Sequence, residues 1–295
     1  MFQQMALIGC GMMGSSLALA LQEACLVRHI VGYSPDADSM AASLQRGAIH
    51  SAAASAAFAV RDADLVVLAV PVAATHSVLQ AIAPSLRADA IITDVGSTKQ
   101  SVLADAHAVL GTERAGQFVA AHPIAGKEHA GAAHAEARLF EGRQVIITPA
   151  RSTRIKSLQA VKEMWETLGC QVQTMTPKQH DMVFAAVSHL PHMTAFALIQ
   201  SILSQPAAAE TLALGGSGFR DFTRIAASNP AMWRDVLLCN REEVLSQTQH
   251  LIAALQNFMR AIENDDADYL YDMIAQASHT RSQWHMTTRD NNALL

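Results

Sequence analysis

The sequence has few charged residues, and this shortage excludes several classes of protein. Only 16% of the 295 residues are Asp, Glu, Lys or Arg, and the 21 basic residues are outnumbered by 26 acidic ones. No run of Lys or Arg could follow a phosphate backbone, which excludes nucleic acid as a partner. With 9 Pro and 15 Gly against 51% hydrophobic residues, the chain is neither disordered nor collagen-like, and we expect a compact protein with a large core.

Long apolar runs, a signal peptide and paired cysteines are also missing. The longest apolar stretch, residues 65–74, contains Pro71 and is too short for a membrane span of about 20 residues. No basic residue precedes Arg28, so the apolar N-terminus lacks the positive region of a signal peptide. The 4 cysteines are scattered without a CxxC pair, which predicts reduced thiols. We therefore expect a cytoplasmic protein without a membrane partner.

The order of apolar and amphipathic segments predicts an α/β Rossmann-type dinucleotide-binding domain, residues 1–175, followed by an all-α helical domain, residues 176–295. In the first part, short β-type runs alternate with amphipathic segments, which is typical of a parallel sheet covered by helices. The predicted strands are Met5–Gly9, His29–Tyr33, Leu65–Val70, Ala90–Val95, Phe118–Ala121, Gln144–Thr148 and Cys170–Met175. The predicted helices include Asp36–Gln45, Ile155–Leu168, Gln179–Ser204, Pro230–Glu263 and Asp266–Trp284.

The helical part carries more apolar residues than a region of about 120 residues can bury within one chain. We therefore expect it to serve as a substrate and dimerisation domain that joins two copies into a homodimer. The alternative is that these helices pack only against the first domain. A monomer mass that does not change with concentration in sedimentation would favour that alternative.

A glycine-rich motif with Gly9, Gly11 and Gly14 stands between the first predicted strand and a helical stretch. In this context G-x-G-x-x-G indicates dinucleotide binding. Gly9 permits the tight turn, Gly11 lets a pyrophosphate approach the backbone, and Gly14 lets the helix pack closely on the strand. Unpaired N–H groups at the start of the helix, where Met12 and Met13 stand, would hold the anion.

The end of the second predicted strand bears on the choice between NAD and NADP. An acidic residue is expected there to bind the adenosine ribose hydroxyls of NAD, but Ser34 follows Tyr33 instead. Asp36 could still reach the ribose, and no Arg stands beside Ser34 to attract a 2′-phosphate. NAD is therefore preferred, and NADP stays open. Alternatively, Asp36 serves only as the N-cap of the following helix.

Polar residues at the ends of further strands and in loops of the helical part form a distinctive set of motifs. The set comprises Pro71, Asp94–Lys99, His122–Glu128, Ser188–His192, Gly215–Arg224 and Met232–Asp235. In order and spacing these segments resemble the prephenate/arogenate dehydrogenase family of tyrosine biosynthesis over most of the chain. The resemblance implies an oxidative decarboxylation of a cyclohexadienyl substrate, in which hydride passes from ring C4 to the nicotinamide and the C1 carboxylate leaves as CO2.

The resemblance also implies roles for particular residues. His122 matches the base that accepts the proton of the C4 hydroxyl, a task that suits histidine at neutral pH. Ser97 would hydrogen-bond the same hydroxyl or orient the imidazole, and Arg224 would grip the departing carboxylate with its planar guanidinium. A donor at His192 favours the keto acid prephenate, with arogenate or dual specificity as the alternative. The other implied residues are Pro71 at the nucleotide site and His189, Asp221, Glu128 and Trp233 at the substrate site.

Each assignment has a structural alternative. His122 could be a structural histidine, and Asp221 and Arg224 could form an exposed ion pair at i and i+3. His189 and His192 lack the converging Cys or carboxylate ligands of a zinc site, so no metal is expected. The histidines expected only to pack or to face solvent are His129, His134, His180, His250, His279 and His285.

Two other functions are compatible with the same architecture. A β-hydroxyacid or imino-acid dehydrogenase would rely on a lysine from the helical domain, but the candidate Lys178 stands at the domain junction. A nicotinamide-binding module without turnover would have no need of His122, Ser97 and Arg224 together. Both alternatives therefore fit the residues less well.

Overall fold

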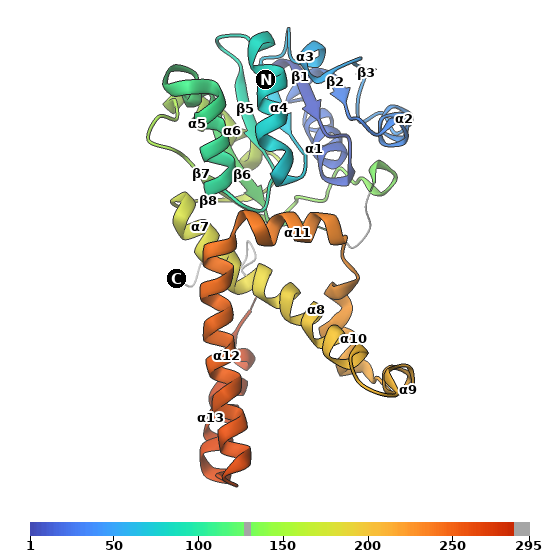
Figure 1. Cartoon of the computed structure of the whole chain (residues 1–295). Coiled ribbons are helices and arrows are strands. Elements are labelled where there is room, and N and C mark those ends of the chain that lie inside the picture. The colour runs from blue at the N-terminus through green and yellow to red at the C-terminus, as the bar shows by residue number, and fades with distance from the viewer. Residues whose placement is uncertain (127–130, 286–295) are drawn as a thin grey trace.

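The computed structural model describes residues 1–126 and 131–285 of the chain. Within these ranges the first part forms one sheet of eight strands in the order β3-β2-β1-β4-β5-β6-β7-β8 (Figure 1). All seven predicted strands are present, with small shifts at their ends. The strands are β1 (Phe2–Ile8), β2 (Val27–Tyr33), β3 (Ser51–Ala52), β4 (Leu65–Leu68), β5 (Ile91–Asp94), β6 (Phe118–Pro123), β7 (Gln144–Thr148) and β8 (Gln171–Thr174).

The central strands could be predicted because they are apolar and buried on both faces. Every residue of β4 is buried, as are the last four residues of β1. Parallel strands that are covered on both faces appear in a sequence as continuous apolar runs. β3 has only two residues and lies beside an Ala-rich stretch, so no such run marks it.

The predicted parallel sheet is present, and one pair of strands in it is antiparallel. β7 runs antiparallel to β6, and it pairs Ile146 with His122. The described part of the connection between them holds only the short helix η4 (Ala132–His134), whereas a parallel return usually runs through a longer crossover helix. β8 then returns parallel to β7 after the crossover helix α6 (Ile155–Thr167).

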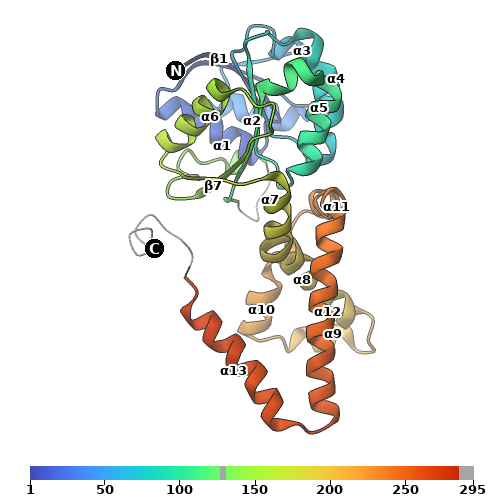
Figure 2. The same cartoon turned by 90° about the vertical axis from the view of Figure 1, so that its left-hand side faces the viewer.

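Helices cover both faces of the sheet and create two cores (Figure 2). One core packs Leu17 of α1 and Trp165 of α6 against the sheet, and the other packs Leu79 of α4 and Val102 of α5 against the opposite face. Besides α6, the helices of this part are α1 (Met12–Glu23), α2 (Ala37–Gln45), α3 (Ala56–Ala59), η1 (Val72–Ala74), α4 (Thr75–Ile82), η2 (Ala83–Ser85), α5 (Gln100–Arg114) and η3 (Ala115–Gln117).

From Pro177 to Gln283 the described chain is helical, but two predicted helices are interrupted. The first is interrupted before Pro191, which has no N–H to donate to the preceding turn, so a wider π-helical turn precedes it. The second is interrupted at Asn240. The helices are α7 (Pro177–Phe184), the π-helical η5 (Ala185–His189), α8 (Leu190–Leu203), α9 (Ala208–Ala213), α10 (Ser217–Thr223), η6 (Arg224–Ala227), α11 (Pro230–Cys239), α12 (Arg241–Glu263) and α13 (Ala267–Gln283).

The two last helices, α12 and α13, extend away from the sheet and are joined at their far end (Figures 1 and 2). α12 exposes large apolar side chains that recur at helical spacing. They are Leu245, Ile252, Leu255, Met259 and Ile262. A contiguous exposed apolar face of this kind marks an interaction surface.

The run Pro177–Leu203 is long and apolar enough to cross a membrane by length and composition, with a mean hydropathy of 1.5. No membrane-spanning helix is expected from the sequence when only unbroken apolar stretches are considered. This run is interrupted by His180, Asp181 and His189. All three side chains are buried, and Asp181 accepts hydrogen bonds from the first domain. We therefore interpret the run as part of the folded helical domain rather than as a membrane span.

Candidate functional site

Four parallel strands end at the edge of the sheet that faces the helical part (Figure 1). β1, β4, β5 and β6 all run in the same direction, so their carboxyl ends share this edge. Gly9, Pro71, Asp94 and His122 stand at or just after those ends. Ligands of open α/β sheets bind at such an edge, as the sequence predicts for these residues.

The glycine-rich turn connects β1 to α1 and leaves room beside its backbone. Gly9 has a φ of +100°, and a Cβ there would lie 2.2 Å from the carbonyl oxygen of Ala69. A Cβ on Gly14 would lie 2.3 Å from the carbonyl oxygen of Gly9, whereas one on Gly11 would meet nothing within 4 Å. Met12 is buried in the core, so it can face a phosphate only through its N–H, which like that of Met13 has no partner within the helix. This open cradle fits a dinucleotide pyrophosphate.

Ser34 and Asp36 lie at the end of β2, where an adenosine ribose would be recognised. Asp36 caps α2 and accepts hydrogen bonds from the N–H of Asp38, at 3.2 Å, and from the hydroxyl of Ser39. The hydrogen bond from Ser39 is the main reason that the pKa of Asp36 lies below its usual value. The N-cap interpretation is therefore confirmed, and the exposed carboxylate keeps its charge beside the predicted ribose position.

The loop after β5 is anchored by a buried ion pair between Asp94 and Lys99. Lys99 Nζ also donates to the carbonyl of Ala121 at 2.8 Å, and the N–H of Ala121 donates to Asp94 at 3.0 Å. These bonds attach the loop to β6 directly before His122. Ser97 lies within this loop and is half-buried, at the same edge of the sheet.

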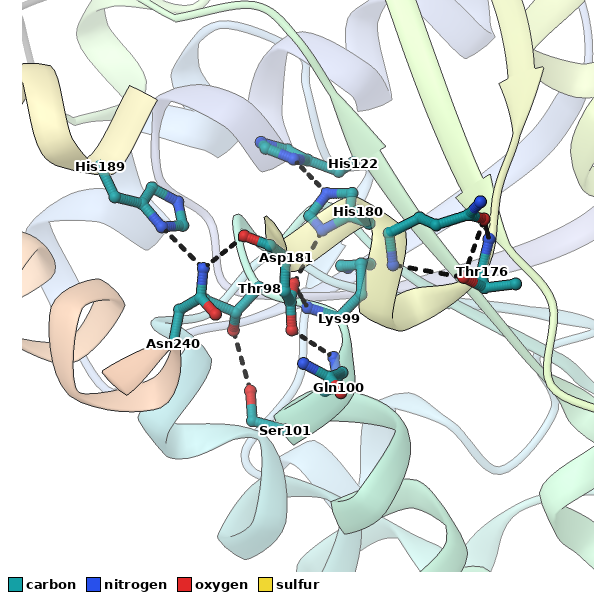
Figure 3. Close-up of polar contacts among 12 residues, drawn as sticks. Thr98, Lys99, Gln100, Ser101, His122, Thr176, His180, Asp181, His189 and Asn240 are labelled. Carbon is teal, nitrogen blue, oxygen red and sulfur yellow. Dashed lines mark hydrogen bonds and ion pairs between the residues drawn. The ribbon is translucent and has the colours of Figure 1, made fainter. Parts of the chain in front are cut away.

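His122 begins a chain of three side chains that ends at a buried carboxylate (Figure 3). Its Nδ1 lies 2.8 Å from Nε2 of His180, and Nδ1 of His180 lies 2.8 Å from Oδ1 of Asp181. Asp181 also accepts from the backbone N–H groups of Lys99 at 2.8 Å and Gln100 at 2.9 Å. The expectation that His180 only packs or faces solvent is wrong, because its fully buried ring links the helical part to His122.

His189 is fixed from the other side by Asn240, the residue between α11 and α12 (Figure 3). The amide nitrogen of Asn240 donates to the carbonyl of Asp181 at 2.8 Å and lies 3.0 Å from Nδ1 of His189. The carbonyl of Asp181 can only accept, so the group of Asn240 that faces it must be the amide nitrogen. The second hydrogen of this nitrogen is donated to Nδ1 of His189. Nε2 of His189 therefore carries the ring proton, and this buried atom makes no hydrogen bond of good geometry, although the backbone of Ser97 lies near.

His192 and Trp233 form a stacked pair beside this cluster, with ring centroids 3.7 Å apart. Nδ1 of His192 donates to the carbonyl of Ser188 at 2.9 Å. Trp233 is buried in the core of the first domain and also packs edge-on against His189. Trp233 is thus a core residue, and at the same time it orients His192.

The remaining predicted substrate residues lie farther along the helical part. Arg224 is exposed at the start of η6, which packs against α8, the helix that carries His192. Asp221 pairs with Arg220 at 3.0 Å on the surface of α10, in place of the expected i, i+3 pair with Arg224. Glu128 lies outside the described residues. Within residues 1–126 and 131–285, no group of His, Cys, Asp and Glu is arranged to hold a metal ion.

Four residues of the cluster were not predicted as site residues: Lys99, His180, Asp181 and Asn240. The sequence offered one indication for two of them. Thr176 and Gln179 form a capping box that starts α7, and the His-Asp pair follows it directly, at the junction of the two parts of the chain. A histidine next to an aspartate at the start of a helix, at the junction of two domains, is therefore a signal for site residues.

Acid should destabilise the folded protein through its buried histidines. Burial lowers the pKa of His189 to about 4, whereas the histidine of an unfolded chain titrates near 6.5. Its contribution to stability is therefore complete above about pH 6.5 and is lost as the pH falls, because only the unfolded chain then takes up a proton. For His189 alone, we expect the free energy of unfolding to fall by about 2 kcal/mol between pH 7 and pH 5. Urea unfolding at the two pH values measures this loss.

The control for this prediction is the variant His189→Gln, which has no titrating group. Its loss of stability between pH 7 and pH 5 should be smaller than that of the wild type by the amount given above. The variant His279→Gln replaces an exposed histidine of α13 and should keep the pH dependence of the wild type. Equal acid sensitivity in the wild type and in His189→Gln would contradict a neutral, buried His189.

Comparison with known proteins agrees with this geometry. A family model described as prephenate dehydrogenase, nucleotide-binding domain, matches residues 17–174, and one described as prephenate dehydrogenase, dimerization domain, matches residues 176–276. A prephenate dehydrogenase of Bacillus subtilis is 35% identical over 277 residues, which cover 93% of this chain and 74% of that protein. A cyclohexadienyl dehydrogenase of Zymomonas mobilis is 35% identical over 284 residues, which cover 95% of each chain.

The solved structures give the same result. The fold is similar to the crystal structure of prephenate dehydrogenase from A. aeolicus in complex with hydroxyphenyl propionate and NAD+, with a TM-score of 0.89 and 34% identity over 95% of this chain and 98% of that one. The two family models cover the sheet and most of the helical part, so the β-hydroxyacid and non-catalytic alternatives are set aside. The chain belongs to the prephenate dehydrogenase family of NAD(P)-dependent oxidoreductases, with a nucleotide-binding α/β domain followed by a helical dimerisation domain.

Proposed function

We propose that this chain catalyses the oxidative decarboxylation of prephenate to 4-hydroxyphenylpyruvate with NAD. The observation that carries the proposal is His122, which lies half-buried on the same sheet edge as the glycine turn. Burial, His180 and Lys99 hold its pKa well below the usual value, so the ring is neutral at neutral pH. Nδ1 is bound to His180, and Nε2 makes no hydrogen bond within the described chain. This nitrogen is free to accept a proton from a substrate.

The chemistry assigned to the chain's own residues is a proton transfer at one hydroxyl group. His122 Nε2 takes the proton of the C4 hydroxyl as hydride leaves C4, and the C4–O bond becomes a carbonyl. The nicotinamide, when bound, supplies the acceptor of the hydride. Loss of the C1 carboxylate as CO2 leaves its electron pair in the ring, and the oxygen regains the proton from His122, which yields a phenol. Ser97 would hydrogen-bond the same oxygen from the loop after β5.

Substrate contacts are assigned to residues of the helical domain. Arg224 would grip the departing carboxylate, since a guanidinium offers two parallel donors to a carboxylate. The proton on the buried Nε2 of His189 lies near the backbone of Ser97, so His189 would serve the substrate site by holding the loop that carries Ser97. Trp233 supports His192 from behind. Asp221 and Glu128 are proposed to line or gate the pocket on the strength of the family motifs.

A specific observation favours arogenate as a second substrate. Because Nδ1 of His192 donates to the carbonyl of Ser188, Nε2 can only accept when the ring is neutral. Burial lowers the pKa of His192, which favours the neutral form. An acceptor suits the ammonium group of arogenate, whereas the keto oxygen of prephenate requires the protonated ring. The expectation of a donor at His192 therefore does not hold for the neutral ring. Prephenate is proposed as the main substrate on the strength of the family descriptions, and arogenate as an accepted one.

NAD is proposed in preference to NADP. The charged, exposed carboxylate of Asp36 stands at the start of α2, beside the position expected for the adenosine ribose. It would attract ribose hydroxyls and repel a 2′-phosphate. The similar A. aeolicus structure contains NAD+, which supports the same choice.

We propose a division into two domains, residues 1–175 and 176–295, and a homodimer formed through the second. The limits of the two family models support the division, because one ends at residue 174 and the other begins at residue 176. The exposed apolar stripe of α12 supports the homodimer. The four free cysteines fit a reducing cytoplasm, which is the proposed location. A concentration-independent monomer mass in sedimentation would contradict the homodimer.

Absorbance of reduced nicotinamide, recorded for the four pairings of two substrates with two cofactors, tests the proposed function. We expect the highest kcat/KM for prephenate with NAD, a lower value for arogenate with NAD, and the lowest values with NADP. If the protein binds NAD but forms no reduced nicotinamide in any pairing, the proposed function is wrong. A higher kcat/KM for arogenate than for prephenate would reverse the order of the substrates.

A further inference from the structure

We propose that Asp181 and His180 are positioning residues, which fix the proton of His122 on Nδ1 and so reserve Nε2 for the proton of the substrate. This inference rests on the proposed function, because it explains why His122, the proposed base, has its proton on Nδ1. The three side chains come from two elements that are far apart in sequence, β6 and α7, and they join the nucleotide-binding domain to the helical domain (Figure 3).

The first step is the ionised state of Asp181. Its Oδ1 accepts from the N–H of Lys99 and from His180, and its Oδ2 accepts from the N–H of Gln100. Burial alone would raise the pKa of this carboxyl, but the hydrogen bonds from His180 and from the two backbone N–H groups outweigh burial and lower it. Both oxygens therefore act as acceptors at neutral pH.

The second step follows from the direction of each hydrogen bond. An ionised carboxylate can only accept, so Nδ1 of His180 must carry a proton. Burial and Lys99 lower the pKa of His180 despite the opposing effect of Asp181, so the His180 ring carries no second proton. Nε2 of His180 is then an acceptor, and the only hydrogen that can occupy the 2.8 Å gap belongs to Nδ1 of His122. In neutral His122, Nε2 therefore carries the lone pair.

The third step concerns the charge that forms when His122 accepts a proton. Lys99 and the neighbouring histidines His180 and His189 disfavour a cation at this position. The imidazolium would donate through Nδ1 to His180, which in turn donates to the carboxylate of Asp181. The buried negative charge at the end of this chain offsets part of the cost of the new positive charge. Asp181 thus stabilises the imidazolium without touching the substrate.

The same helix also arranges a second histidine in the opposite sense. Asn240 holds the carbonyl of Asp181 and donates to Nδ1 of His189, which places the proton of His189 on Nε2. The cluster thus presents one imidazole nitrogen as a fixed acceptor and another as a fixed donor. A cluster that served only to pack the domains together would have no need for two opposite tautomers.

The experiment measures the tautomer directly. In 15N NMR spectra of histidine-labelled protein at neutral pH, without substrate, we expect His122 to show a protonated Nδ1 and an unprotonated Nε2. His189 should show the reverse pattern. Signals are assigned from the single variants His122→Asn and His189→Gln. If His122 of the wild-type protein is protonated on Nε2, the proposal is wrong, and this spectrum alone decides it.

The variant Asp181→Asn tests the cause. Asparagine has no charge and only one acceptor oxygen. Because Oδ1 of Asp181 accepts from both Lys99 and His180, an asparagine oxygen at that position would keep the tautomer of His122, whereas an amide nitrogen there would reverse the donors along the chain. In either orientation the buried negative charge is lost, so we expect a kcat at least roughly 10²-fold lower and a KM within a few-fold of the wild type, since the same replacement in a serine protease triad lowers kcat about 10⁴-fold. An Asp181→Asn protein that retains the wild-type kcat overturns the proposal.

A matched control is available in the chain. Asp105 also pairs with a histidine, His76, at 3.2 Å, but this partly exposed pair joins α5 to α4. Asp105→Asn should leave kcat and the tautomer of His122 unchanged. Failure of the proposed function is distinguishable from failure of this inference, because an inactive wild type could still show the expected tautomer.

Discussion

The variant His122→Asn is expected to lower kcat by roughly 10²-fold or more while KM and the affinity for NAD change only modestly. Asparagine can keep a donor near His180, but its amide cannot take up a proton. The hydroxyl proton would then have to leave to water from a half-buried position at the sheet edge. General-base catalysis contributes about 10²–10⁴-fold, which sets the size of the expected loss. Steady-state kinetics with prephenate and NAD measures it.

The control for this variant is another half-buried histidine on a strand of the same sheet. His29 lies on β2 and contacts Ser51 at 3.3 Å, away from the glycine turn and the helical domain. His29→Asn should leave kcat within a factor of about two, as expected for a side chain outside the site. Equal turnover of His122→Asn and the wild type would remove His122 from the role of base, whatever the tautomer of its ring.

Much of the fold could be predicted because it depends on local patterns. Apolar runs such as Leu65–Leu68 are recognisable because both of their faces are buried. Gly9 and Gly14 stand at positions where a Cβ would overlap backbone atoms, so the motif reflects a steric necessity. The direction of β7 depends on whether a crossover helix precedes it, and the residues of β7 do not show whether one does.

The site could be predicted only in part, because its members act through long-range contacts. His122 and Ser97 follow strands, so the rule on strand ends finds them. His180 and Asp181 stand in a helix, 58 and more residues from their partners, and nothing in a helical pattern shows that they face the sheet. Asn240 could not be predicted for the same reason, because its partners are distant in the sequence. It separates two helices that the sequence predicts as one.

The variants Gly9→Ala and Gly11→Ala should separate folding from nucleotide binding within one turn. At Gly9 the new Cβ would lie 2.2 Å from a backbone oxygen of Ala69, with φ at +100°, and neither atom can move without shifting a central strand. Positive φ alone costs of order 1–3 kcal/mol for a residue other than glycine, and the overlap adds to it. We expect Gly9→Ala to be severely destabilised, with a large fall in Tm or no folded protein at all.

At Gly11 the opposite outcome is expected. Its φ is −79° and a Cβ would meet nothing within 4 Å, so alanine fits the free protein and Tm should change little. The added methyl group would occupy the space where the pyrophosphate approaches, and an overlap worth about 1–3 kcal/mol weakens NAD binding roughly 10-fold or more. Calorimetric titration with NAD measures the Kd. Gly216 begins α10 with nearly the same backbone angles and equally open space, so Gly216→Ala should bind NAD as the wild type does. Wild-type affinity in a folded Gly11→Ala protein would show that the pyrophosphate does not lie on this turn.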